Sequence, residues 1–230
     1  MRKQDYVNTP NCVIIDAAMY SSTKRVLVAM LAHCSKKGMV RKSLDELAAL
    51  SHCSPVTVRR ALAELEDRGI VYKNRCFRYS DYLSMMVNGR NAYQINRRKL
   101  QGSYTLVPRA LLTAEVSHST FVAALYIYKT AGRDGRCWPS LRHVAKRTDL
   151  SKATVCRALK ALRRAGLIEK RSCHRRGTRI HCCNSYYPTA WVRPGGQKVK
   201  EAASAASLGK GGLIFNQHRV INKITGGYTG

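Results

Sequence analysis

The stretch "SKATVCRALKALRRAGLIEKR", residues 151–171, combines the marks of a helix start, an amphipathic helix and a helix stop. Ser151 is a preferred N-cap type, because its side-chain oxygen can accept a hydrogen bond from an unpaired amide of the first turn. The apolar residues that share one face of the expected helix are Val155, Leu159 and Leu162. Gly166 is the residue type that ends helices, and the apolar pair after it predicts a strand.

The same pattern occurs a second time in the chain. Residues 43–73, "SLDELAALSHCSPVTVRRALAELEDRGIVYK", align without a gap to residues 140–170, "SLRHVAKRTDLSKATVCRALKALRRAGLIEK". Identical pairs include Ser54/Ser151, Thr57/Thr154, Arg60/Arg157 and Gly69/Gly166. An ungapped internal repeat of this length predicts two copies of one supersecondary unit.

Each copy follows a segment with a Tyr and a Pro, and then an expected core helix. The segments are "YVNTPNCVII" and "YTLVPRALLT", and the helices are predicted over residues 22–34 and 119–130. In the first helix the apolar spacing predicts a single buried face. That face would carry Val26, Leu27, Met30, Leu31 and Cys34.

A second helix and a tight turn are expected next in each copy. Ser43 and Glu46 have the spacing of a capping box, whereas the second copy starts its helix at Ser140. The three-residue turns are 51–53 and 148–150. Their middle residues, His52 and Asp149, are types that tolerate the left-handed conformation. Their last residues, Cys53 and Leu150, would fill the angle between the helices.

Strands and hairpins follow the third helix of each copy. In the second copy "LIEK" continues into "RSCHRRGTRIHCCNSYY", which predicts a hairpin around a glycine-containing turn. In the first copy the return strand is predicted at residues 91–96, after a longer excursion. The expected fold is mainly α with small β-hairpin wings (α+β), in domains 1–100 and 101–192 with a flexible basic tail at 193–230.

Both copies resemble the winged helix-turn-helix superfamily, in the form shared by regulators of bacteria and mobile elements and by plasmid replication proteins. The resemblance rests on residues 138–171 and, more loosely, on residues 42–73. It implies DNA binding, with the third helix in the major groove and the wing on the neighbouring backbone. The turns depart from the family pattern, because they carry His52 and Asp149 where a glycine is common.

The charge of the chain favours a polyanionic partner. The 230 residues include 41 Lys and Arg against 13 Asp and Glu, a formal net charge of +28. Residues 1–100 carry 18 basic and 8 acidic groups and residues 101–192 carry 17 and 4, so both halves are basic. Such an excess attracts nucleic acid and says nothing about fold.

The candidate DNA contacts lie on the two third helices and on the second hairpin. Arginine can read guanine with two hydrogen bonds, whereas threonine and N-cap amides can hold a phosphate. The hairpin "KRSCHRRGTR" concentrates basic residues that repel one another unless phosphates lie opposite. Arg75, Arg78 and Arg90 of the first copy are more dispersed. The predicted DNA-binding residues are Ser54, Thr57, Arg59, Arg60, Ser151, Lys152, Thr154, Arg157, Arg171, Arg175, Arg176 and Arg179.

Other kinds of site are disfavoured by the residue pattern. Cys173, His174, His181 and Cys182 flank the second hairpin, but strand neighbours point to opposite faces and the chain holds no CxxC pair. The histidines are dispersed, carboxylates are sparse, and "GKGG" at 209–212 lacks the spacing of a phosphate loop. We therefore expect no metal, no cofactor and no enzymatic activity.

The remaining features concern location and partners. Nine cysteines without a leader segment, and no apolar run near the ~18 residues of a membrane helix, predict free thiols in a cytosol, away from membranes. The resemblance to bacterial DNA-binding proteins implies a bacterial cytosol, near the nucleoid. The apolar residues of the tail could form a homodimer or protein contact, and a disordered end explains them equally well. Cys156 aligns with Arg59, so the two third helices would read different bases.

The interpretation of the whole sequence is a protein that binds double-stranded DNA at a specific site. A transcriptional regulator of the mobile-element type is the first hypothesis. A plasmid replication initiator or accessory DNA-processing factor that binds repeated sites is the second, and an RNA-binding or structural partner protein is the third. A fold shared by all of these does not decide between them.

Overall fold

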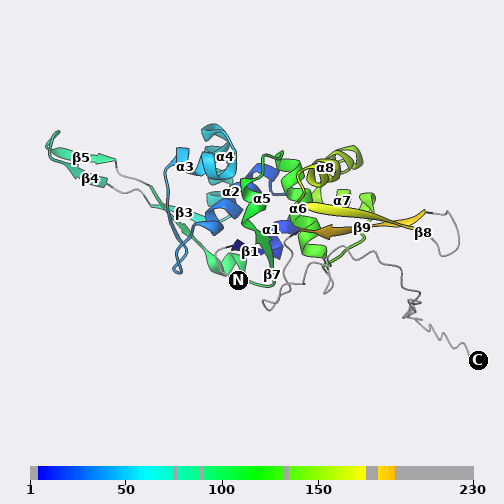
Figure 1. Ribbon diagram of the computed structural model, residues 1–230. Helices are drawn as coiled ribbons and strands as arrows, with labels where there is room; N and C mark the ends of the chain where they lie inside the picture. Colours follow the sequence, from blue (N-terminus) through cyan, green and yellow to red (C-terminus); the bar gives the residue numbers. More distant parts are fainter. Residues whose placement is uncertain (1–4, 75–76, 89–90, 132–134, 175–180, 190–230) are drawn as a thin grey trace, which may run out of the picture. The chain divides into compact units, whose positions relative to one another are not determined.

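The computed structural model describes residues 5–74, 77–88, 91–131, 135–174 and 181–189 (Figure 1). These residues belong to one compact unit that spans Met1–Val199. The fold mixes helices with small antiparallel sheets, which agrees with the predicted α+β class.

Two series of elements follow one another along the chain. The first consists of β1 (Tyr6–Pro10), α1 (Asn11–Ile15), α2 (Ser21–Ala32), β2 (Met39–Arg41), α3 (Leu44–Ser51), α4 (Pro55–Asp67), β3 (Val71–Asn74), β4 (Phe77–Ser80), β5 (Met85–Asn88) and β6 (Ala92–Ile95). A 3-10 turn, η2 (Arg97–Leu100), leads to the second series. It consists of β7 (Tyr104–Pro108), α5 (Arg109–Thr113), α6 (His118–Thr130), α7 (Leu141–Thr148), α8 (Lys152–Arg164), β8 (Ile168–His174) and β9 (His181–Pro188).

The second helix and the turn of each series have the predicted local structure. Ser43 and Glu46 form the capping box of α3, and the Ser140 hydroxyl accepts a hydrogen bond from a backbone amide of α7. His52 and Asp149 are left-handed, with φ of 50° and 55°. Each turn therefore changes the direction of the chain between two helices without a glycine.

The third helices also start, pack and end as predicted. Ser54 and Ser151 cap α4 and α8 through their side chains. Gly69 and Gly166 follow the last turns with φ of +64° and +66°, where a side chain would be strained. The face that packs inward is buried at Val58, Leu62 and Leu65 in α4 and at Val155, Leu159 and Leu162 in α8.

The strands after the third helices pair as expected, with two additions. β6 returns alongside β3, and β9 pairs with β8. The first addition is β2, which pairs with the other edge of β6 and completes a three-stranded sheet. The second is a separate hairpin of β4 and β5, inserted in the excursion between β3 and β6. Neither addition was predicted.

The first core helix corrects the sequence interpretation. α2 ends at Ala32, so Cys34 lies beyond it, and every residue from Thr23 to Met30 is buried where one buried face was expected. The cause is tertiary, because α2 packs against α3 and α4 of its own series and against α6 of the other. An amphipathic pattern cannot reveal a helix that is covered on several sides.

The two series share structure at their starts. β1 and β7 form an antiparallel pair in which Val7 lies opposite Val107. Val7, Ile14, Val28 and Ala29 of the first series belong to the hydrophobic cluster that the second series builds. Residue 100 as a domain boundary thus stays a prediction, and the halves meet through a common core.

Two cations of α2 are buried near this junction, and one of them, Arg25, bridges it. The Arg25 guanidinium donates to the Ala114 carbonyl at 2.9 Å and to the Val116 carbonyl, and it lies 5.2 Å from the centroid of the Phe121 ring. The Lys24 ammonium donates to the Ile14 carbonyl at 3.3 Å. Burial lowers the pKa of both cations from their ordinary values. Carbonyl oxygens and a ring face compensate part of the cost of burying Arg25.

Candidate nucleic-acid interface

The N-terminus of α8 is organised around two hydroxyls and an arginine. The Ser151 Oγ accepts from the Thr154 amide at 3.1 Å and lies 2.9 Å from the Thr154 Oγ1. The Arg157 guanidinium donates to the same Thr154 Oγ1 at 3.5 Å. Arg157 and Lys152 are exposed, and Thr154 is half-buried. An exposed arginine is thereby held next to the amides of a helix N-terminus, which is where anions bind.

The N-terminus of α4 has the same serine cap as α8 but lacks the positive charge of a lysine in its first turn. The Ser54 Oγ accepts from the Thr57 amide at 3.2 Å and lies 2.8 Å from the Thr57 Oγ1. Arg59 and Arg60 are exposed on this helix. Pro55 stands at the position that Lys152 takes in α8, so α4 begins without a cation.

The two helix pairs differ in charge far more than the two halves do. Residues 44–67, which contain α3 and α4, include two basic and five acidic residues. Residues 141–164, which contain α7 and α8, include eight basic residues and a single acidic one, Asp149. The first helix pair is therefore acidic, although the first half of the chain as a whole is basic. Polyanion attraction concentrates on α7 and α8.

Part of the acidic charge of α4 is used inside the fold. Arg68 pairs with Asp16 at 2.8 Å and with Glu64 at 3.0 Å. Thr23 of α2 donates to the second oxygen of Glu64 at 2.6 Å. These contacts fasten the last turn of α4 to α2 and to the segment before it.

On the second hairpin, Arg171 has a partner within the protein. Its guanidinium donates to both carboxylate oxygens of Glu169, at 3.0 and 3.2 Å, and lies 4.7 Å from the centroid of the Tyr187 ring. The hydrogen bond and charge of Glu169 raise the pKa of Arg171 above its ordinary value. Lys170 is exposed beside it. Arg175, Arg176 and Arg179 lie outside the described residues, as do Arg75, Arg90 and the side chain of Arg78.

The position of Cys156 explains part of the difference between the third helices. It is half-buried in α8, whereas Arg59 at the matching position of α4 is exposed. The pKa of Tyr186 in β9 is raised by burial, and the charges of Cys137 and Cys156 raise it further. The third helices thus differ at this position in burial as well as in charge.

The described cysteines are free thiols, and their surroundings bear on the question of a metal site. Cys12, Cys34, Cys53, Cys137 and Cys156 are free thiols. Burial raises the pKa of Cys137 to about 11, so this thiol stays protonated at neutral pH. Among the residues that the structure describes, no three potential ligands cluster. The side chains of Cys173, His174, His181 and Cys182 fall outside that part.

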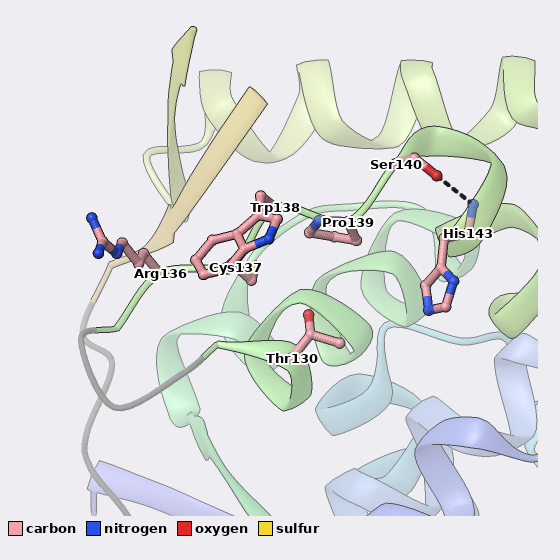
Figure 2. Close-up of a pocket in the computed structure, with 7 residues that line it drawn as sticks. All are labelled: Thr130, Arg136, Cys137, Trp138, Pro139, Ser140 and His143. Atoms are coloured by element: carbon pink, nitrogen blue, oxygen red, sulfur yellow. Dashed lines mark hydrogen bonds between the residues drawn. The ribbon is translucent and has the colours of Figure 1, made fainter. Parts of the chain in front are cut away.

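A hollow before α7 adds residues that the sequence analysis missed. It has a volume of about 440 Å³ and is lined by Thr130, Arg136, Cys137, Trp138, Pro139, Ser140 and His143 (Figure 2). Trp138 is 62% exposed, and the Arg136 guanidinium lies 5.9 Å from its ring centroid. The signal in the sequence was a tryptophan two residues before the predicted helix start at Ser140. In the helix-turn-helix proteins that the sequence resembles, the helix before the third one crosses the DNA backbone, which makes the Arg136–Trp138 pair a candidate contact.

The comparison with known families supports a helix-turn-helix domain in the second half. A family model described as a helix-turn-helix domain matches residues 115–168, which run from the segment before α6 to the start of β8. No curated protein matches the chain. Within the described residues, no helix has the length and apolar character that crossing a bilayer requires. The chain thus contains a helix-turn-helix domain, and such a domain points to DNA as partner.

Proposed function

We propose that this protein binds double-stranded DNA at a specific site through two winged helix-turn-helix units. α4 and α8 are the recognition helices, and the wings are the strand pairs β3–β6 and β8–β9 that follow them. The observation that carries the proposal is the organised, basic N-terminus of α8 inside the matched helix-turn-helix domain. The exposed basic side of α7 and α8 supplies the sequence-independent attraction to phosphates.

Within this proposal the residues of α8 divide into two roles. Arg157 reads a base edge, because a guanidinium matches guanine O6 and N7 with two hydrogen bonds. Its bond to Thr154 aims it before DNA arrives, which lowers the entropy lost on binding. Lys152 and the backbone amides at the N-terminus of α8, next to Ser151, hold a phosphate. Lys160, which is exposed further along α8, contacts the DNA backbone at another point.

The first unit contributes through Arg59 and Arg60, with Ser54 and Thr57 at the helix start. Its acidic α3 and α4 attract phosphates less, so we assign it readout rather than most of the affinity. Arg136 with Trp138, and Arg171, Arg175, Arg176 and Arg179 of the second wing, extend the contact along the backbone. Arg171 must share its charge with Glu169, so its contribution is the smallest of the wing residues.

The biological role that we propose is transcriptional regulation without enzymatic activity, in a bacterial cytosol. A plasmid replication initiator is the second candidate. It is favoured by one observation, namely that two unlike recognition helices are joined by β1–β7 and by Arg25 in one unit. A joined pair of this kind suits a composite or repeated site.

Selection of bound sequences from random duplexes tests the proposal. We expect an enriched motif that the protein binds at least about a thousandfold more tightly than random DNA. The triple variant Lys152→Ala/Arg157→Ala/Lys160→Ala should lose the motif, while the control Lys36→Ala/Lys37→Ala should keep it. No enrichment, or stronger binding to RNA, would contradict the proposal. A footprint then separates the roles, since a regulator protects a site near a promoter and an initiator protects an array of repeats.

A further inference from the structure

The hairpin of β4 and β5 exposes an unusual amount of apolar surface. Tyr82 at its turn is 95% exposed. The side chains that each expose more than half of their surface are Phe77, Tyr79, Tyr82, Leu83, Met85 and Met86. None of the described residues of this hairpin belongs to either hydrophobic cluster. Contiguous exposed apolar surface on this scale marks a place of association.

The strand register collects part of this surface on one face. Tyr79 lies directly opposite Met86, and side chains at opposite positions of an antiparallel pair point to the same side. Phe77 is two residues before Tyr79 and shares that side. The three side chains form an exposed stripe that we name the hairpin stripe, residues Phe77, Tyr79 and Met86.

The backbone of the hairpin is also unpaired at its outer edges. In the part of the chain that the structure describes, β4 and β5 pair only with each other, so each has one open edge. A lone two-stranded hairpin is marginally stable in water, and open edges are templates for further strands. No proline and no lysine, the usual protections of an edge, occurs in residues 77–88.

We propose that the β4–β5 hairpin is the contact through which two copies of this protein associate. Charge favours a second copy at this place, because residues 77–88 carry one Arg and one Asp in a chain of net charge +28. Elsewhere on the strongly basic surface two copies repel each other, and a neutral hairpin offers no attraction to DNA phosphates. The composition of the patch, aromatic residues and methionine without charge at its centre, is that of protein interfaces.

The area of the exposed apolar surface also fits a second copy of the protein. Aromatic side chains cover roughly 150–250 Å² each, so the six exposed side chains, counted over both faces and the turn, offer on the order of 700 Å² per copy, and the hairpin stripe alone about half of that. A stable interface takes about 800 Å² from each partner. Two copies related by a two-fold axis bury the hairpin stripe of both, and an open edge of each pairs with its equivalent in the other. The association uses no residue assigned above to DNA, so it goes beyond the proposed function and occurs without DNA.

Sedimentation velocity of the full chain over a concentration series tests this proposal. Salt high enough to screen the net charge is included, and DNA is left out. We expect a reversible dimer for the native sequence. The variant Tyr79→Lys/Met86→Lys should raise the dimer dissociation constant roughly 30-fold or more, as loss of an interface hot spot does. The control Tyr20→Lys, at an aromatic residue that is 73% exposed outside the hairpin, should leave the constant unchanged.

Three outcomes would overturn the proposal. The first is a native protein that stays monomeric at every concentration, and the second is a dimer that the hairpin variant and the control affect equally. The third is a variant that weakens DNA binding of the monomer while leaving the dimer intact, because the hairpin is then a DNA contact. Circular dichroism of each variant verifies folding. The single variant Met86→Ala, which introduces no charge, should also raise the dimer dissociation constant.

Discussion

The helix pairs α3–α4 and α7–α8 are built alike and charged oppositely. Both have a serine at the start of each helix and a left-handed polar residue in the turn. The first pair is acidic and precedes an apolar hairpin, whereas the second is strongly basic and precedes a basic hairpin. Caps, turns and core positions therefore specify the fold, and the exposed positions decide what each copy of that fold can bind.

The largest effect is expected in the cores, where the two copies should behave alike. Leu65 and Leu162 occupy matching, fully buried positions. Leu65→Ala and Leu162→Ala should each lower the free energy of unfolding by about 2–5 kcal/mol, through lost burial and a cavity. Because the halves share a core, each variant should unfold in one transition, followed by circular dichroism in urea. Separate transitions for the two halves would break the comparison, and Lys160→Ala serves as a surface control.

DNA readout should separate the two copies at a matched position. Arg157→Ala should cost about 1–3 kcal/mol on the selected site and much less on random DNA, because a base contact is lost. Arg60→Ala should cost less, because α3 and α4 carry five acidic residues against two basic ones and attract DNA less. Fluorescence anisotropy with both duplexes measures the difference. Equal losses on selected and random DNA for Arg157→Ala would remove its assigned role.

The smallest expected effect is a change in how stability depends on pH, caused by the histidine at the first position of α6. Burial, and then the charge of Arg25, lowers the pKa of His118 at the start of α6, whereas α2 starts with Ser21. The unfolded chain has a histidine pKa of about 6.5, so on acidification below it the unfolded state takes up the proton more readily. Stability should therefore fall as the pH drops through that value, and His118→Gln should reduce this fall. His33, whose pKa burial also lowers, keeps a residual slope. Unchanged pH profiles of urea unfolding would refute the assignment.

The sequence was a good guide where structure is local. Ser54 and Ser151 as caps, His52 and Asp149 as left-handed residues, and Gly69 and Gly166 as helix stops depend on neighbours within a few positions. The buried faces of α4 and α8 follow from apolar spacing. The charge contrast between the helix pairs was also countable, but totals over whole halves concealed it.

Features that depend on distant segments could not be obtained in this way. The pairing of β1 with β7 joins strands about a hundred residues apart, and nothing in either strand specifies its partner. The buried position of Arg25 is set by carbonyl groups of the other half. For the candidate site, the Arg171–Glu169 pair was within reach of sequence reasoning, whereas the partial burial of Cys156 was not. The β4–β5 hairpin had a readable indication, the alternation of Phe77 and Tyr79.

The salt dependence of DNA binding tests the central claim most directly, namely that the second helix pair holds the DNA backbone and the first contributes little to it. The dissociation constant for a random duplex is measured against salt concentration for the native protein, Lys152→Ala/Lys160→Ala in α8 and Arg59→Ala/Arg60→Ala in α4. Each lost phosphate contact lowers the logarithmic slope by about 0.9. We predict a decrease of nearly two such steps for the α8 variant and of less than one for the α4 variant. Equal decreases, or a larger one for α4, would contradict the account.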